Sequence, residues 1–140
     1  MNPLRYDNLI LPARSEAAAG KLKLHHSEIG ARYVLVDKEN FPKTRLYSMV
    51  RTVRGITSAK KHLEDHIHDV DSVMTFIGDN DDLSGLQIEV RLNDEIQVVE
   101  SPFSVYVPGG LRHGYKFVKG SGKYINLVLT EGGDYNAVTR

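Results

Sequence analysis

The chain has 140 residues, of which 41% are apolar and 26% are charged, as expected for one ordinary globular domain. Eighteen basic residues balance eighteen acidic ones, so no overall field attracts nucleic acid or an anionic membrane. The absence of cysteine excludes disulfides, thiolate metal sites and cysteine nucleophiles, and no apolar run approaches the roughly 20 residues of a membrane-spanning helix.

The N-terminal third is weakly patterned. Residues 15–23 include three consecutive alanines, which are good helix formers, but Gly20 follows at once. We therefore expect one short helix or an irregular arm there. The next segment, Ala31 to Val36, is rich in β-branched and aromatic residues and ends at a polar turn, which predicts a strand.

The remainder of the chain is patterned as many short strands. Each is bounded by clusters of Gly, Pro, Asn or Asp, such as residues 78–82 and 119–122. The predicted strands are Tyr47 to Arg54, Ser72 to Ile77, Leu86 to Leu92, Ile96 to Val99, Ser104 to Val107, Tyr115 to Val118 and Tyr124 to Thr130. Short strands at regular spacing predict an all-β sandwich or barrel.

The alternation of side chains predicts which faces are inward. From Leu86 to Leu92 the apolar and polar residues alternate strictly, as in a half-buried strand. From Tyr124 to Thr130 one face is wholly aliphatic. The opposite face carries Tyr124, Asn126, Val128 and Thr130, a mixture suited to lining a cavity.

Histidines are concentrated in residues 60–71. If this segment is extended, His62, Glu64, His66 and His68 share one face. A His-x-His pair on a strand can direct two ring nitrogens to one ion at about 2.1 Å. Such triplets also arise by chance, and surface histidines need no function, so this pair alone is a weak signal.

A second segment supplies a third histidine. Residues 107–113 end a predicted strand in the turn Pro108-Gly109-Gly110 and present His113 at the start of the next. With both motifs present, residues 47–130 resemble the cupin superfamily, which carries His-x-His and Pro-x-Gly-x-x-His on neighbouring strands. The stretch from His66 through Glu95 also resembles small bacterial cupins without an assigned reaction.

The resemblance implies a fold and a metal site. The fold is the cupin double-stranded β-helix, a jelly-roll-like barrel over residues 46–140. Residues 1–45 then form an N-terminal arm and first strands that pack on the barrel, within one domain overall. The metal ligands implied are His66, His68 and His113. The competing interpretation is a cupin-shaped barrel whose histidines hold no metal.

The family's motif glutamate is missing. It is expected four or five residues after His68, where this chain has Ser72 and Val73. Two other acids remain open as a fourth ligand: Asp71, which lies three residues after His68, and Glu64, which shares the predicted face of the histidines.

A site with only three histidines has chemical consequences. Three neutral imidazoles leave a divalent ion with its full charge and open positions on one face, which favours an anionic, chelating substrate. Similar sites occur in cupin-type thiol, β-diketone and gentisate dioxygenases. We expect one divalent transition metal, with iron first and zinc, nickel, manganese or copper as alternatives.

Four residues are candidates for substrate binding. Arg51 lies on a predicted strand, with Tyr47 and Met49 on its side, and from an inner face it can pair with a carboxylate. The other candidates are Tyr106, Tyr115 and Asn126. The competing interpretation is a solvated arginine, with the tyrosines serving as packing.

Two functional classes remain open from the sequence. One is a metal-dependent enzyme acting on a small anionic metabolite, for which an Fe(II) oxygenase, a lyase, an isomerase and a decarboxylase are all candidates. The other is a small-molecule binding or sensing module. We expect a cytoplasmic homodimer with a small-molecule partner and without a nucleic-acid or membrane partner.

Overall fold

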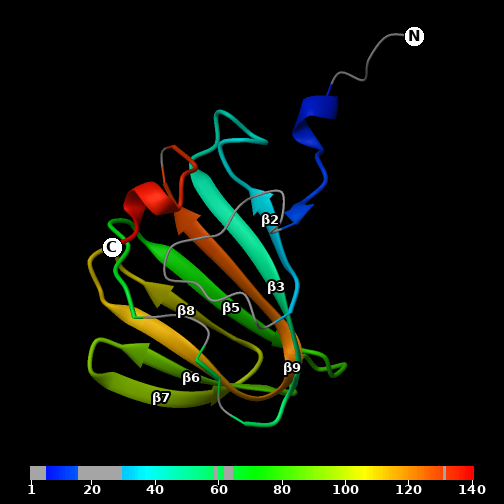
Figure 1. The fold of residues 1–140 in the computed structure, drawn as a ribbon, viewed down its shortest axis with the longest axis vertical. Coiled ribbons are helices and arrows are strands. Elements are labelled where there is room, and N and C mark those ends of the chain that lie inside the picture. Colours follow the sequence, from blue (N-terminus) through cyan, green and yellow to red (C-terminus); the bar gives the residue numbers. More distant parts are fainter. Residues whose placement is uncertain (1–5, 16–29, 59, 62–64, 131) are drawn as a thin grey trace.

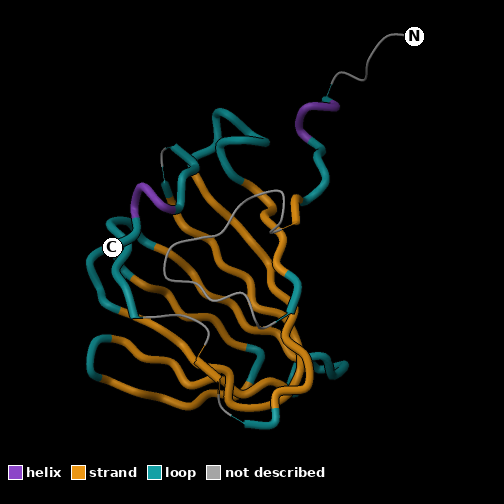
Figure 2. Tube along the Cα trace, in the orientation of Figure 1, coloured by secondary structure: helices purple, strands orange, loops and turns teal. Residues whose placement is uncertain are grey.

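The computed structural model describes residues 6–15, 30–58, 60–61, 65–130 and 132–140, and within them the chain forms nine strands and two short 3-10 helices (Figure 2). The strands are β1 (Arg14–Ser15), β2 (Arg32–Val36), β3 (Leu46–Ile56), β4 (Lys60–Lys61), β5 (Ser72–Gly78), β6 (Leu86–Leu92), β7 (Glu95–Glu100), β8 (Phe103–Val107) and β9 (His113–Leu129). The helices are η1 (Asp7–Leu9) and η2 (Asn136–Val138). The predicted all-β class is confirmed.

The long strand β9 joins the two halves of the fold (Figure 1). Its first part pairs with β6 between residues 113 and 120, and β7 pairs with β6 on the other side. Its second part pairs with β3 and with β5, and the sheet continues from there to β2 and β8. Because one strand belongs to both halves, the sheet folds over and encloses an interior.

The turn predicted at residues 119–122 is wrong, because these residues are a bend within β9. Gly120 has a φ of +106°, which side chains other than glycine rarely adopt. A Cβ on Gly120 would lie 2.0 Å from the carbonyl oxygen of Gly85, and one on Gly122 would lie 2.1 Å from that of Ile77. The glycines therefore permit close approach of neighbouring backbones where β9 passes from pairing with β6 to pairing with β3 and β5.

The core lies between the two halves, on the faces that the alternation predicted. On β9, Tyr124, Asn126 and Val128 are buried, whereas Leu129 on the opposite face is 47% exposed. The buried apolar residues are Val34, Tyr47, Met49, Val53, Met74, Phe76, Leu86, Ile88, Val90, Val107, Tyr115, Phe117, Tyr124, Val128 and Tyr135.

The described residues before β1 extend away from the barrel, and the C-terminal residues return to it. The helix η1 projects beyond the sheets (Figure 1), and β1 pairs with β2. The helix predicted in residues 15–23 falls almost wholly outside the described residues. At the other end, Ile67 and Arg140 exchange backbone hydrogen bonds of 2.7 and 2.6 Å. The C-terminal segment is thereby fixed against the His-x-His motif.

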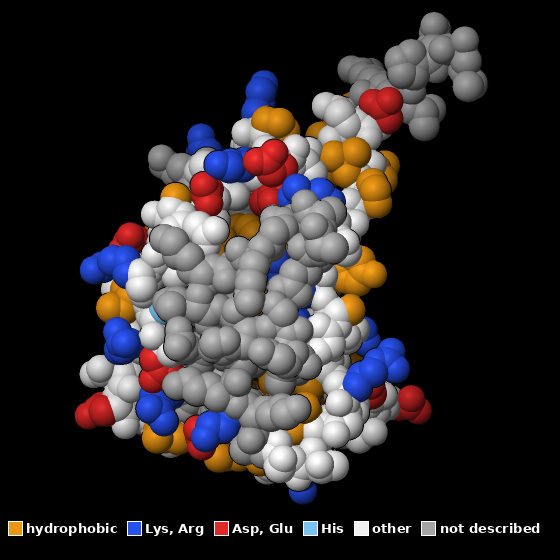
Figure 3. Space-filling model, viewed as in Figure 1, with side chains coloured by type: hydrophobic (Ala, Val, Ile, Leu, Met, Phe, Trp, Pro, Cys, Tyr) orange, Lys and Arg blue, Asp and Glu red, His pale blue; other side chains and the backbone are white. Residues whose placement is uncertain are grey.

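Charged side chains of both signs are interspersed on the face seen in Figure 3, consistent with a chain of zero net charge. Among the described residues, no helix combines the length and the apolar character needed to cross a membrane.

Candidate metal centre

Three histidines meet at one end of the barrel. His66 and His68 lie just before β5, and His113 begins β9. His66 and His113 face each other in an antiparallel bridge, which fixes the two motifs side by side. The ring centroids lie 4.5 to 4.9 Å apart, and each residue is at most 2% exposed. The structure therefore brings together the three predicted metal ligands.

Hydrogen bonds fix the tautomers of two of the rings. The Thr139 hydroxyl donates to the carbonyl of Tyr135 at 2.7 Å, so its oxygen accepts from Nδ1 of His68 at 3.0 Å. Nδ1 of His113 lies 3.0 Å from the Leu111 carbonyl, which can only accept. Both rings thus carry their proton on Nδ1, and Nε2 keeps the lone pair that a metal needs.

The spacing of the nitrogens fits a single ion. Nε2 of His66 and Nε2 of His68 are 3.3 Å apart, and one ring nitrogen from each histidine lies within 4.8 Å of the others. Two ligands bound at about 2.1 Å, with angles between octahedral and tetrahedral, lie roughly 3.0–3.4 Å apart. The pair of His66 and His68 already has this separation.

Burial keeps the rings of His68 and His113 neutral near pH 7. It lowers the pKa of His68 to about 3, and repulsion from His66 and His113 adds to the effect. Burial also lowers the pKa of His113, although the Leu111 carbonyl and the nearby Asp65 charge oppose this. Neutral imidazole is the form that binds metal, so no proton has to leave these two rings near neutral pH.

A tyrosine that sequence reasoning missed completes the cluster. Tyr135, just before η2, is 2% exposed, and its hydroxyl lies 3.2 Å from Nε2 of His66. Its ring packs edge-on against His68 with centroids 5.1 Å apart. Burial raises its pKa, Tyr124 raises it further, and a side-chain interaction with Thr139 opposes the rise. No motif or strand periodicity marks Tyr135, because long-range packing of the C-terminal segment places it.

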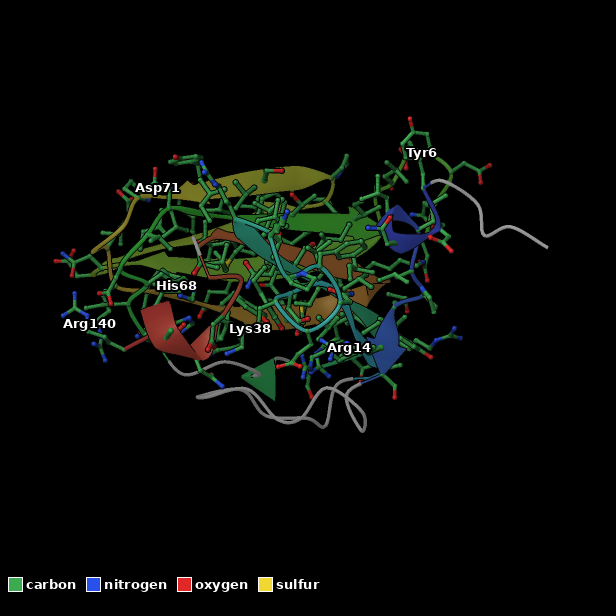
Figure 4. All side chains as sticks on the ribbon, turned by 90° about the horizontal axis from the view of Figure 1, so that it is seen from above. Tyr6, Arg14, Lys38, His68, Asp71 and Arg140 are labelled. Carbon is green, nitrogen blue, oxygen red and sulfur yellow. The ribbon has the colours of Figure 1, made fainter. Side chains whose placement is uncertain are left out.

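The two acids considered as a fourth ligand are not part of the described cluster. Asp71 accepts hydrogen bonds from the Tyr106 hydroxyl and, at 2.8 Å, from the amide of Gly109, and these bonds lower the pKa of its carboxyl. In Figure 4, Asp71 lies beside the outer strands and His68 nearer the middle. In this structure, Asp71 thus stabilises the turn before His113. Glu64 lies outside the described residues.

Tyr106 also differs from its predicted place. It is 59% exposed on the edge strand β8 and does not line the interior. The candidates Arg51, Tyr115 and Asn126 are all buried on the inner face. Tyr115 and Arg51 lie close enough that the arginine's charge opposes the rise in the tyrosine's pKa caused by burial.

Arg32 is a second buried guanidinium that the sequence analysis did not single out. It is 2% exposed and is the register partner of Arg51 across β2 and β3. Nη1 of Arg32 lies 3.3 Å from the Tyr47 hydroxyl, and Nη1 of Arg51 donates to the Gly30 carbonyl at 2.9 Å. Two cationic side chains thus occupy facing inward positions of the barrel.

A recess of about 230 Å³ connects this region with the surface. Its buried lining includes Arg32, Tyr47 and Tyr135, and its rim includes the ion pair of Lys38 with Asp134. Two larger recesses, one of about 400 Å³ lined by β6, β7 and β8 and one of about 610 Å³ beside η1, contain no histidine of the cluster in their linings. The lining of the 230 Å³ recess has no histidine either, but it includes Tyr135, whose hydroxyl lies 3.2 Å from Nε2 of His66.

No family model matches the sequence, and no curated protein matches it. Solved structures do match. KdgF from Halomonas sp. is 14% identical over 71% of this chain and 76% of its own, with a TM-score of 0.50. The polyketide cyclase RemF from Streptomyces resistomycificus is 14% identical over 94% of this chain and 80% of its own, with a TM-score of 0.55.

Oxalate decarboxylase from Bacillus subtilis, in a structure concerned with its Mn(II) centres, is 13% identical with a TM-score of 0.57. The match covers 91% of this chain but only 29% of the decarboxylase, so this chain corresponds to a part of that protein. Such low identities show the fold and not the activity. The cupin fold predicted from the two histidine motifs is confirmed.

Proposed function

We propose that the chain is a metal-dependent enzyme of the cupin type, acting on a small anionic metabolite that chelates the ion. The observation that carries this proposal is the convergence of three buried imidazoles from His66, His68 and His113. A bound divalent ion would supply a Lewis acid with positions open to substrate. The protein's own contribution is to hold His68 and His113 in the ligating tautomer and to bury all three rings away from bulk water.

Charge balance favours an anionic substrate. Within the described residues, the candidate ligand cluster contains no carboxylate, so three neutral nitrogens would leave the ion's double positive charge uncompensated. An anionic chelator is bound more tightly by such an ion than by one already neutralised.

The paired guanidiniums support the same class of substrate. Arg32 and Arg51 occupy directly opposed positions on neighbouring strands, where like charges repel. A carboxylate bound beside them relieves that repulsion and gains charge-assisted hydrogen bonds. We propose that Arg51 is the anchor for a substrate carboxylate and that Tyr115 and Asn126 line the same space.

We propose iron as the metal and an Fe(II) oxygenase as the class of enzyme. Imidazole ligands suit iron, and open positions beside three histidines leave room for both a chelating substrate and dioxygen. The Mn(II) centres of the decarboxylase with a similar fold support a divalent metal in this kind of barrel without choosing the reaction. Lyase and isomerase chemistry are the alternatives among enzymes.

The second candidate is a binding or sensing module that uses the metal without turnover. The feature that favours it is the absence of a carboxylate from the described cluster, since the motif glutamate is replaced by Ser72 and Val73. Consumption of dioxygen or of a bound acid separates the two candidates.

The test compares carboxylates with neutral analogues on the Fe(II)-loaded protein under anaerobic conditions. Pyruvate and oxalate should bind more tightly than pyruvamide. Arg51→Met should weaken the acids about 10- to 100-fold, the loss expected for a charge-assisted hydrogen bond, and leave pyruvamide unchanged. Arg91→Met is the matched control, because Arg91 pairs with Asp65 and is partly exposed. Equal binding of acids and amide, unaffected at Arg51, would contradict the proposal.

A further inference from the structure

Tyr135 directs a hydroxyl group into the candidate metal centre from outside both histidine motifs. The hydroxyl oxygen lies 3.2 Å from Nε2 of His66, nearly the 3.3 Å that separates the Nε2 atoms of His66 and His68. Two ligands of one ion have about this separation. The phenol is therefore within reach of an atom that binds the metal beside His66.

We propose that the Tyr135 hydroxyl donates a hydrogen bond to the oxygen atom that a substrate places on the metal, and so selects oxygen-donor anions for this site. The proposal rests on the metal-dependent function proposed above and adds the class of donor atom that the site prefers. In this role, Tyr135 is a specificity-determining residue.

The chemistry of the lone pairs leads to this assignment. Without a metal, the phenol oxygen and Nε2 of His66 share a hydrogen bond of 3.2 Å, whose direction depends on the tautomer of His66. A metal takes the lone pair of that nitrogen, so the same atom can no longer accept the phenol proton. The neighbouring atom on the ion then becomes the acceptor, provided that it keeps a lone pair after coordination. Carboxylate, alkoxide and enolate oxygens keep one, whereas the coordinating nitrogen of an imidazole does not.

The local packing holds Tyr135 in this orientation. Its ring lies between Tyr47, at a centroid distance of 5.2 Å, and His68, at 5.1 Å. The Thr139 hydroxyl donates to the backbone carbonyl of Tyr135 at 2.7 Å. The orientation of the phenol therefore depends on its ring and backbone, and removal of the hydroxyl alone leaves these contacts in place.

The test uses Co(II)-loaded protein, whose visible absorption reports ligands bound to the ion. Wild type and Tyr135→Phe are each titrated first with Co(II), then with oxalate and separately with imidazole. The variant should bind Co(II) within threefold of wild type and imidazole within twofold. Its affinity for oxalate should fall about 10- to 100-fold, as expected for loss of a hydrogen bond to a charged acceptor. Tyr124→Phe is the matched control, because it removes a buried phenol directed at Tyr115.

Three outcomes would count against the proposal. An unchanged oxalate affinity in Tyr135→Phe would show that the phenol donates elsewhere, with Thr139 as the nearest candidate. A Co(II) affinity lowered more than 100-fold would make Tyr135 a ligand through its phenolate oxygen. Failure of the wild type to bind Co(II) would remove the proposed function as well, and the first titration identifies that case before any variant is compared.

Discussion

The amide of His66 donates to the carbonyl of His113, and the amide of His113 donates to the carbonyl of His66, both at 2.9 Å. This reciprocal pair joins the His-x-His segment to the start of β9. It places the two rings with centroids 4.5 Å apart on the inner side of the barrel. The backbone thus brings together two motifs that are distant in the sequence.

Metal content is the most direct consequence of this arrangement. His66→Ala, His68→Ala and His113→Ala should each lower the bound metal to less than about a tenth of the wild-type content, because two imidazoles hold a divalent ion much less tightly than three. Elemental analysis of anaerobically purified protein measures this. Asp71→Asn is the control, since the Asp71 carboxyl bonds Tyr106 and Gly109, and it should retain full metal. Full metal in the His113 variant would show that the ion lies elsewhere.

Thr139 should affect metal affinity without touching the ion. Its oxygen accepts the Nδ1 proton of His68 and thereby fixes the ring that ligates through Nε2. Thr139→Val should weaken metal binding about 10- to 100-fold, the usual effect of losing such a supporting hydrogen bond. Competition with a chromophoric chelator measures the affinity, and Thr75→Val, at an exposed threonine bonded to Ser104, is the control. An unchanged affinity in Thr139→Val would mean that the ring needs no such support.

The parts of the site predicted from sequence are those encoded by nearby residues. His66 and His68 are separated by one residue on an extended segment, and His113 follows a turn that Pro108 and the glycines make visible. The period of two placed Arg51 on the same face as Tyr47 and Met49, but left open whether the arginine was solvated, and the structure shows that it is buried. The local sequence pattern is sufficient to predict a site residue where one short segment determines both the position of the residue and the direction of its side chain.

The parts that were missed depend on contacts between distant segments. Tyr135 and Thr139 reach the histidines because the C-terminal segment forms backbone hydrogen bonds with residues 67–69. The alternation of apolar and polar residues in the sequence does not predict that pairing. Arg32 lies on a predicted strand, but its importance comes from the register that sets it opposite Arg51. Asp71 stayed open as a fourth ligand because its hydrogen bond from the Gly109 amide joins segments 38 residues apart, which no local pattern reveals.

The bend of β9 gives a test of the fold itself. Gly120→Ala forces a Cβ to within 2.0 Å of the Gly85 carbonyl oxygen, and backbone on both sides must move. We expect it to destabilise the protein by about 3 kcal/mol or more, as for other severe overpacking in a core.

Gly55→Ala is the matched control, because Gly55 also has a positive φ, of +60°, but has open space around it. Its cost should be about 1–2 kcal/mol, from backbone conformation alone. Urea unfolding measures both, and equal losses would show that the close approach at Gly120 is unimportant.

The last prediction concerns the acid sensitivity of the metal-free protein. His68 has a pKa of about 3 in the folded state, compared with about 6.5 for an unperturbed histidine. Above pH 6.5 the ring is neutral in both states and does not affect the pH dependence of stability. Between pH 6.5 and 3 the unfolded chain takes up a proton that the folded chain does not, so stability falls as pH falls, by about 1.4 kcal/mol per unit. Below pH 3 the loss is complete. His113, whose pKa is also lowered, acts in the same direction.

Urea unfolding with a chelator present, at pH 7.5 and pH 5.0, measures this effect. The loss due to His68 between these conditions should be about 2 kcal/mol, since only the interval below 6.5 contributes. The carboxyls of Asp71 and Asp134 stay ionised throughout, because their pKa values are lowered from 3.8. In His68→Asn the loss attributable to this ring should disappear, leaving a smaller loss from His113. Excess metal should protect the wild type at pH 5.0, because an ion bound only to the folded state opposes protonation of its ligands. If the metal-free wild type has the same free energy of unfolding at both pH values, His68 is not a neutral buried group.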